Sequence, residues 1–232
     1  MKRLLAVAGF SIASVAFAPG HAAAQVATVD EGSFTIYQRG TRLGHEDFRI
    51  RRMPVTDSTN EYVASAVVAY PGRRLSPDLR TGTRGGPLAY TLESKNGAQL
   101  QERVSGQFGR GRFSAVRRTA DGESTKEYAL GDGAVILDDE VFSQYYFVGQ
   151  SGRPGSFAVV CPRCSSQSTL RLEDRGSERL TIGGSPIEAR HVMLRDSGGL
   201  DRELWLDARG RVLKVAIPSR ELIAIRDELP RG

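Results

Sequence analysis

Apolar and polar positions alternate along most of the chain in short runs. In SFTIYQ (33–38) and EYVASAVVAY (61–70) every second side chain falls on the same face, which is typical of half-buried β-strands. Turn signals separate the runs. Asn96-Gly97 predicts a tight hairpin, since both turn positions need positive φ, and a second hairpin is expected at 120–123. The expected strands are 33–38, 45–53, 61–70, 88–94, 98–106, 112–119, 124–130, 156–161, 168–174, 178–184, 187–194, 202–207, 211–218 and 222–228.

One segment breaks the alternation. In LDDEVFSQYYFVGQ (137–150) the large apolar residues recur at helical spacing, and Asp138 and Asp139 precede them as candidate N-caps. The pattern predicts a short amphipathic helix over 138–148, although Tyr, Phe and Val also favour strands. The apolar face of this helix would carry Val141, Phe142, Tyr145 and Tyr146.

The remaining organisation is that of one domain. Residues 70–87 are rich in Gly, Pro and Arg, and we expect a mobile loop over one end of the sheet. No repeat or low-complexity linker interrupts 25–232. The sequence therefore predicts a single, mainly β domain over these residues.

The N-terminus has the three parts of a secretory signal peptide: a basic start, an apolar run over 4–18 and small residues up to Ala24. We expect cleavage before Gln25, with residues 1–24 as the signal peptide and a periplasmic or secreted mature protein. The apolar run is shorter than the ~20 residues that a membrane-spanning helix needs. No second such run follows, so no transmembrane span is expected.

Charge does not point to a nucleic acid. The chain has 32 basic and 27 acidic residues, and loss of Lys2 and Arg3 leaves 30 against 27, a net charge of +3. Acidic and basic residues are interleaved, and no basic block occurs. A mixed, solvated surface is expected, with no nucleic-acid partner.

Two stretches resemble a known class of exported proteins. GSFTIYQRGTRLGHEDFRI (32–50) has the form Phe-x-Ile-x-x-x-Gly-x-x-x-Gly-x-x-x-Phe, and RELWLDARGRVLKVAIPSRELIAIR (202–226) holds a Trp-x-Asp hairpin and a last strand. Together they resemble uncharacterised exported bacterial families with a fold similar to the periplasmic lipoprotein-localisation (LolA/LolB-like) carriers. The resemblance implies a half barrel, a single curved antiparallel sheet with one short helix on its concave side. It carries over no catalytic residue, and implies a concave apolar pocket that in the carriers holds acyl chains.

The only two cysteines stand in CPRC, Cys161 and Cys164. Export to an oxidising compartment favours a disulfide, which would fix a turn between two strands. A zinc site would need two further ligands, so a half-site completed across a dimer stays an alternative. A redox pair is the third, although a reactive cysteine of that type usually lies at a helix N-terminus.

Other candidate chemistry is incomplete. RDSGGL (195–200) resembles the serine motif of trypsin-like proteases, but Arg195 and Leu200 replace its glycine and proline, so Ser197 is interpreted as a turn residue. Glu46 and Asp47 are adjacent on an expected strand and face opposite sides. We predict no catalytic residue, no metal site and no cofactor.

Three functional hypotheses follow. The first is a non-enzymatic exported protein that binds an apolar or amphipathic ligand, such as a lipid, or an envelope partner, with Val141, Phe142, Tyr145 and Tyr146 lining the pocket. The second is an interaction module whose concave face is filled by its own side chains. The third is a hydrolase or redox protein, which would need polar groups that converge in space.

Overall fold

The computed structural model describes residues 25–56, 59–131, 133–151 and 155–231. The predicted signal peptide, 1–24, lies outside the described residues. Two short 3₁₀ segments and one α-helix accompany the strands: η1 (Phe142–Tyr145), α1 (Tyr146–Ser151) and η2 (Pro218–Arg220). The strands are β1 (Ala27–Gln38), β2 (Thr41–Thr56), β3 (Thr59–Tyr70), β4 (Arg73–Gly82), β5 (Pro87–Asn96), β6 (Gln99–Gly109), β7 (Arg112–Thr119), β8 (Gly122–Ala129), β9 (Val135–Ile136), β10 (Gly155–Cys161), β11 (Ser166–Ile182), β12 (Ser185–Asp196), β13 (Arg202–Leu206), β14 (Val212–Ile217) and β15 (Leu222–Arg226).

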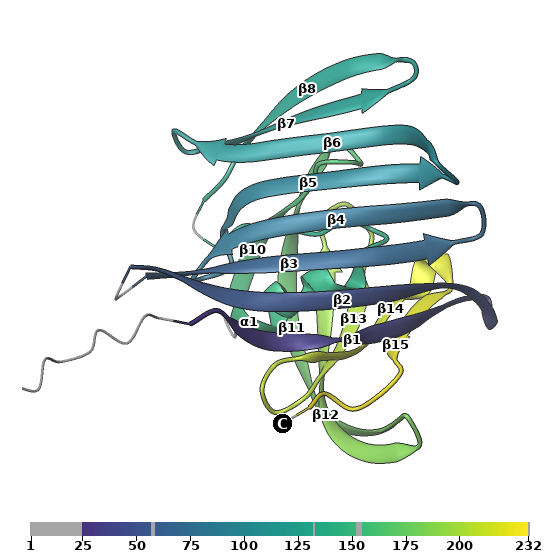
Figure 1. The fold of residues 1–232 in the computed structure, drawn as a ribbon. Helices are drawn as coiled ribbons and strands as arrows, with labels where there is room; N and C mark the ends of the chain where they lie inside the picture. The colour runs from purple at the N-terminus through teal and green to yellow at the C-terminus, as the bar shows by residue number, and fades with distance from the viewer. Residues whose placement is uncertain (1–24, 57–58, 132, 152–154, 232) are drawn as a thin grey trace, which may run out of the picture.

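All of these strands belong to one sheet, in the order β8-β7-β6-β5-β4-β3-β2-β1-β15-β14-β13-β12-β11-β10-β9. Neighbours are antiparallel, except for the parallel pair β9–β10. The pairing of β1 with β15, from Phe34 opposite Arg226 to Gln38 opposite Leu222, joins the first half of the chain to the second. In Figure 1 strands β1–β8 cross the front and β10–β15 lie behind them.

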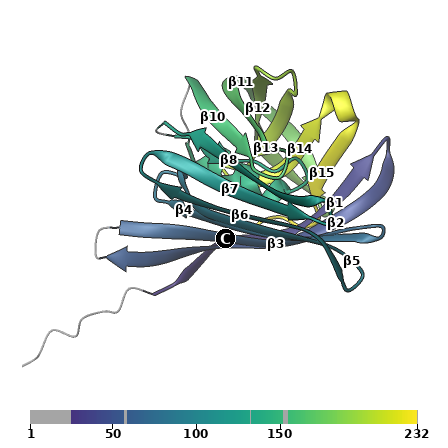
Figure 2. The same ribbon diagram turned by 90° about the horizontal axis from the view of Figure 1, so that it is seen from above.

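The sheet curves strongly and does not close. Its two ends, β8 and β9, do not pair with each other among the described residues. Figure 2 shows β7 and β8 curling over towards β10–β12. Side chains bridge part of the gap: Lys126 Nζ donates to the carbonyl of Ser165 at 2.6 Å, and Gln167 Nε2 donates to that of Ala129 at 3.2 Å. The predicted fold class, a half barrel with a short helix on its concave side, is confirmed.

The helical segment enters the concave side and contacts strands from both halves, with η1 against β3 and β14. It begins later than the pattern predicts, at Phe142 rather than at Asp138. Val141 occupies the N-cap position and makes no side-chain cap. Asp138 and Asp139 do not cap the helix, because their carboxylates form ion pairs with arginines.

The expected loop over 70–87 is wrong, because residues Arg73–Gly82 form strand β4. Leu75, Leu79 and Thr81 are buried in it, while charged residues occupy most of the outward positions and mask the alternation. Pro77 cannot donate a ladder hydrogen bond, and it lies where the β3–β4 register is interrupted, between Leu75 and Asp78. The proline therefore fits inside a strand.

Two apolar clusters stabilise the sheet. The larger fills the concave side, where the inward side chains of most strands meet the helical segment, and its bulkiest buried members include Tyr90, Phe113 and Phe34. A smaller cluster around Trp205 lies on the opposite face of the C-terminal strands. His191 stacks on the Trp205 ring with centroids 4.5 Å apart, and Lys214 Nζ lies 3.9 Å above that ring. Trp205 is thus a packing residue of the outer face.

Candidate functional site

The four predicted pocket residues lie inside the half barrel. Val141, Phe142 and Tyr145 are each about 1% exposed, and they fill the concave side together with inward side chains of the sheet. Tyr146 differs, because it also lines a cavity at the end of the helical segment. The structure therefore separates the predicted set into three core residues and one cavity residue.

The cavity next to Tyr146 has a volume of about 250 Å³. It lies between the helical segment and the turn that joins β4 to β5. The rings of Tyr146 and Phe147 meet edge to face there, with centroids 5.5 Å apart. The lining residues are Tyr62, Thr83, Arg84, Gly85, Tyr146, Phe147 and Gln150.

Hydrogen bonds between its glycines close the β4–β5 turn, and Gly85 packs against the helix. Gly82 N donates to Gly86 O, and Gly85 N donates to Gly82 O, each at 2.9 Å. Gly85 has a φ of +80°, a conformation that L side chains rarely adopt, and a Cβ there would already touch Phe147 at 3.6 Å. This turn places Thr83 and Arg84 at the rim of the cavity.

A second cavity continues on the other side of the same turn, with a volume of about 340 Å³. It shares Thr83 and Arg84 with the first. Its lining combines Leu88, Leu130 and Phe108 with polar groups, and Phe108 leaves 40% of its surface exposed. We call the two cavities together the rim groove; the second is lined by Gly82, Thr83, Arg84, Gly86, Pro87, Leu88, Phe108, Leu130, Gly131 and Gly133.

Tyr146 contributes a neutral hydroxyl to this groove. Burial, together with a smaller effect of the neighbouring Tyr62, raises the pKa of Tyr146 to about 12. The hydroxyl therefore stays protonated at neutral pH and can donate a hydrogen bond. The groove combines aromatic and aliphatic walls with a few polar groups, which is the usual character of a small-molecule site.

An acidic segment, residues 138–140, lies at the opposite end of the half barrel, where its carboxylates pair with arginines. Asp138 is fully buried and accepts hydrogen bonds from Arg163 Nε and Nη2, the closest at 2.7 Å. Arg163 Nη2 also lies 2.6 Å from Glu140, and Arg73 pairs with the other oxygen of that carboxylate. We call this group, with Asp139 and its partners, the arginine cluster.

Asp139 completes the arginine cluster. Arg202 Nη2 lies 3.3 Å from one of its carboxylate oxygens and Arg220 Nη2 lies 2.7 Å from the other. The four arginines come from four different turns or strand starts, so the acidic segment ties together turns that are far apart in sequence. Arg73 begins β4 and the rim groove follows the end of β4, so the two features lie at opposite ends of the half barrel.

Glu46 anchors the start of the helical segment. Its carboxylate is fully buried and accepts the backbone N–H groups of Phe142 at 2.7 Å and Ser143 at 2.9 Å. Burial raises the pKa of Glu46 to about 7, and the hydrogen bonds from Ser143 and Phe142 offset part of that rise. Asp47 points outward, where its carboxylate lies 3.1 Å from His45 Nε2, so the two acids face opposite sides as predicted.

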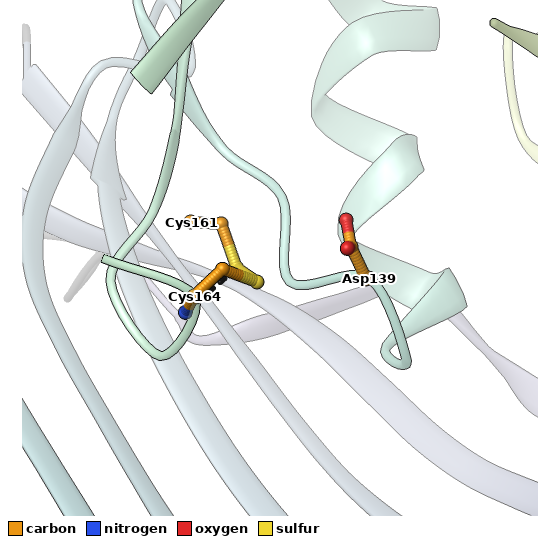
Figure 3. Close-up of side chains that lie close together, drawn as sticks. All are labelled: Asp139, Cys161 and Cys164. Carbon is orange, nitrogen blue, oxygen red and sulfur yellow. Dashed lines mark hydrogen bonds between the residues drawn. A yellow bond between two sulfur atoms is a disulfide. The ribbon is translucent and has the colours of Figure 1, made fainter. Parts of the chain in front are cut away.

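Cys161 and Cys164 form a disulfide across the β10–β11 turn. The sulfurs and a carboxylate oxygen of Asp139 lie within 4.8 Å of one another (Figure 3). Bonded sulfurs offer no thiolate to a metal, and Arg202 and Arg220 already hold Asp139. In this state the group is a staple next to the arginine cluster, and Arg163 lies within the turn that the disulfide closes.

Ser197 is placed as a turn residue between β12 and β13. Its hydroxyl accepts the backbone N–H of Thr169 at 3.0 Å, and its own N–H donates to Thr169 O at 3.0 Å. No histidine is among the hydrogen-bond partners of Ser197 in the described part of the chain. The residues of the protease-like motif thus form the turn between β12 and β13.

Sequence reasoning missed most of the rim groove. Tyr62 belongs to an expected strand, but nothing in its pattern marks it as a cavity residue. Arg84 lay in the supposed loop. The position of Tyr146 alone could be found, because helical spacing placed it on the apolar face of the predicted helix.

Comparison with known proteins adds a structural likeness. No family model matches the chain. No curated protein matches it either. Among solved structures, the chain is similar to a β-barrel-like protein of a domain of unknown function, DUF1849, from Brucella abortus, with a TM-score of 0.49 and 8% identity over 85% of this chain and 95% of that one. This likeness does not bear on the lipoprotein-localisation carriers in particular. Within the described residues, no helix is long and apolar enough to cross a membrane.

Proposed function

We propose that the protein is an exported, non-enzymatic binding protein that takes up an apolar or amphipathic ligand at the rim groove. The observation that supports this proposal is the cavity of about 250 Å³ between Tyr146, Phe147 and Tyr62, which continues into the second cavity beside Phe108. Each cavity lies near the lower bound of the roughly 300 to 1,000 Å³ typical of ligand sites. A single short chain fits this space better than a bulky lipid.

The filled interior supports a second hypothesis, an interaction module without a small ligand. Val141, Phe142 and Tyr145 occupy the space in which the carriers' acyl chain would lie. The two hypotheses differ at the rim groove, which a ligand would enter and a pure interaction module would leave empty.

A chain-length series separates them. Hexanol, octanol and decanol are titrated calorimetrically into the mature protein. Each further buried methylene contributes ~0.8 kcal/mol, so affinity should rise roughly fourfold per CH₂ until the groove is full. Thr83→Trp, an exposed position at the groove rim, should weaken decanol binding at least tenfold. Thr41→Trp, exposed at the start of β2, is the matched control and should not. Affinity that is independent of chain length, or unaffected by Thr83→Trp, would favour the interaction module.

Export is part of the same proposal and is tested separately. The N-terminal sequence of protein recovered from the periplasm or medium of its host should begin at or near Gln25. Retention of Met1 in the mature protein would contradict export by a cleaved signal.

A further inference from the structure

Arg84 differs from the arginines at the other end of the molecule. Arg73, Arg163, Arg202 and Arg220 are all paired with carboxylates of the acidic segment. The side chain of Arg84 is exposed and makes no hydrogen bond or ion pair with any of the residues that the structure describes. Its guanidinium therefore carries five donors that no described residue uses.

Arg84 is also the point at which the two cavities meet. It lines both of them, together with Thr83. The other described lining residues are neutral, and they comprise aromatic, aliphatic, glycine, threonine and glutamine side chains. The rim groove thus presents apolar walls on both sides of a single positive charge.

From this arrangement we propose that the ligand of the rim groove is a single-chain anionic amphiphile, whose carboxylate or phosphate head binds Arg84 and whose chain lies along the groove. The inference rests on the proposed function and narrows it to one class of ligand. A planar guanidinium matches the geometry of both anions and can bind either through two parallel hydrogen bonds. A chain that leaves Arg84 has an apolar wall in either direction, towards Tyr146 or towards Phe108.

Neutral donors in the groove fit the same ligand. The Tyr146 hydroxyl stays protonated at neutral pH. The Gln150 amide nitrogen already donates to Arg209 O at 2.8 Å, so its second N–H is the one that remains for an oxygen of the head group. No acidic side chain is among the described lining residues. The groove is therefore complementary to a negative head and an apolar tail together.

The test compares ligands that differ only in the head group. Decanoate, decyl phosphate and decanol are titrated at pH 8, below their micellar concentrations, into the mature wild-type protein and into Arg84→Gln. An exposed ion pair is worth up to about fivefold in affinity, and partial desolvation in the groove increases this. We expect Arg84→Gln to weaken decanoate or decyl phosphate binding five- to twentyfold, and to change decanol binding less than twofold.

Three comparisons make the result specific. Arg74→Gln removes the same charge from the far end of β4, at another exposed position, and should leave all three affinities unchanged. Arg84→Lys keeps the charge but loses the two parallel donors, so it should bind the anions more tightly than Arg84→Gln and less tightly than wild type. Raising NaCl from 0.05 to 0.5 M should weaken anion binding but not decanol binding. The tighter of the two anions identifies the head group.

Each other outcome is decisive. If decanol binds as tightly as both anions, the rim groove takes apolar ligands without charge selection, and the inference fails while the proposed function stands. If Arg84→Gln weakens decanol as much as decanoate, Arg84 only shapes the groove, and the inference again fails. If none of the three ligands binds, both the inference and the proposed function are wrong.

Discussion

Replacing Arg163 by alanine should destabilise the fold more than replacing an arginine of an exposed ion pair. The Asp138 side chain is 0% exposed and the Arg163 side chain is 14% exposed, so the ion pair is shielded from solvent. The substitution leaves a buried carboxylate without its cation, and removing one partner of a buried pair costs roughly 3 to 5 kcal/mol. Loss of the second contact, to Glu140, adds to this.

Thermal denaturation followed by far-UV circular dichroism measures the effect. For a domain of roughly 200 residues, 1 kcal/mol shifts Tm by roughly 2 to 4 °C, so Arg163→Ala should lower Tm by roughly 6 to 20 °C. Arg118→Ala is the matched control, because Arg118 and its partner Glu123 are mostly exposed, and it should cost under about 1 kcal/mol.

The cause can be separated from a loss of packing. Adding Asp138→Asn to Arg163→Ala removes the unpaired charge, so the double variant should be more stable than Arg163→Ala alone. If Arg163→Ala costs no more than Arg118→Ala, the carboxylate of Asp138 does not depend on Arg163. The assignment of the arginine cluster as a structural clamp would then be wrong.

Three further predictions concern the helical segment and the staple. The pKa of Glu46 is about 7 in the folded protein against 4.5 unfolded, so its contribution to stability is full below pH 4.5 and is lost as pH rises through 7. Glu46→Gln should abolish about 3 kcal/mol of that pH dependence in urea titrations. Replacing Cys161 and Cys164 by serine should cost about 2 kcal/mol by the chain-entropy relation for so short a loop. Gly149→Ala should cost about 1 to 3 kcal/mol, since its Cβ would lie 2.2 Å from Gly210 O.

Each of these has its own control. Wild type and Glu46→Gln are compared across pH 4 to 8, and parallel curves would mean that Glu46 does not titrate there. Thiol labelling of the denatured, unreduced protein should find no free cysteine, and bound zinc in stoichiometric amount would reverse the disulfide assignment. Gly109→Ala places its Cβ in open space, so an equal effect of Gly149→Ala would show that the contact with Gly210 is not limiting.

Much of the sheet follows from alternation, because a half-buried strand repeats every two residues and its turns need particular residue types. The predicted hairpin forms with its turn one residue later, at Gly97-Ala98: Asn96 ends β5 and pairs with Gln99, and Gly97 has a φ of +57°. β4 was missed because its outward positions are charged and its centre holds Pro77, two features that suggest a loop. The expected strands 168–174 and 178–184 are instead one strand, β11, with an irregular register between Asp174 and Gly176. A bulge and a turn look alike in sequence, because both favour Gly and Asp.

The candidate site was less accessible to sequence reasoning. Helical spacing could place Tyr146 on an apolar face, but only the curvature of the sheet decides which residues of that face border empty space. Arg84 belongs to the β4–β5 turn and Phe108 to β6, and only the folded protein brings them to one cavity. The pairing of Asp138 with Arg163 likewise joins residues whose relation depends on the β10–β11 turn.

The helical segment shows why its boundary could not be predicted from spacing. A helix of six residues is too short to be stable by itself, since nucleation costs more than one or two hydrogen bonds return. Its start is therefore set by tertiary contacts: the Glu46 carboxylate accepts the first N–H groups, at Phe142 and Ser143, and arginines hold the residues before it. The sequence pattern predicts the apolar face, Val141 to Tyr146. The first helical turn forms where the Glu46 carboxylate of β2 can accept its N–H groups. Glu46, which lies almost a hundred residues earlier, determines that position.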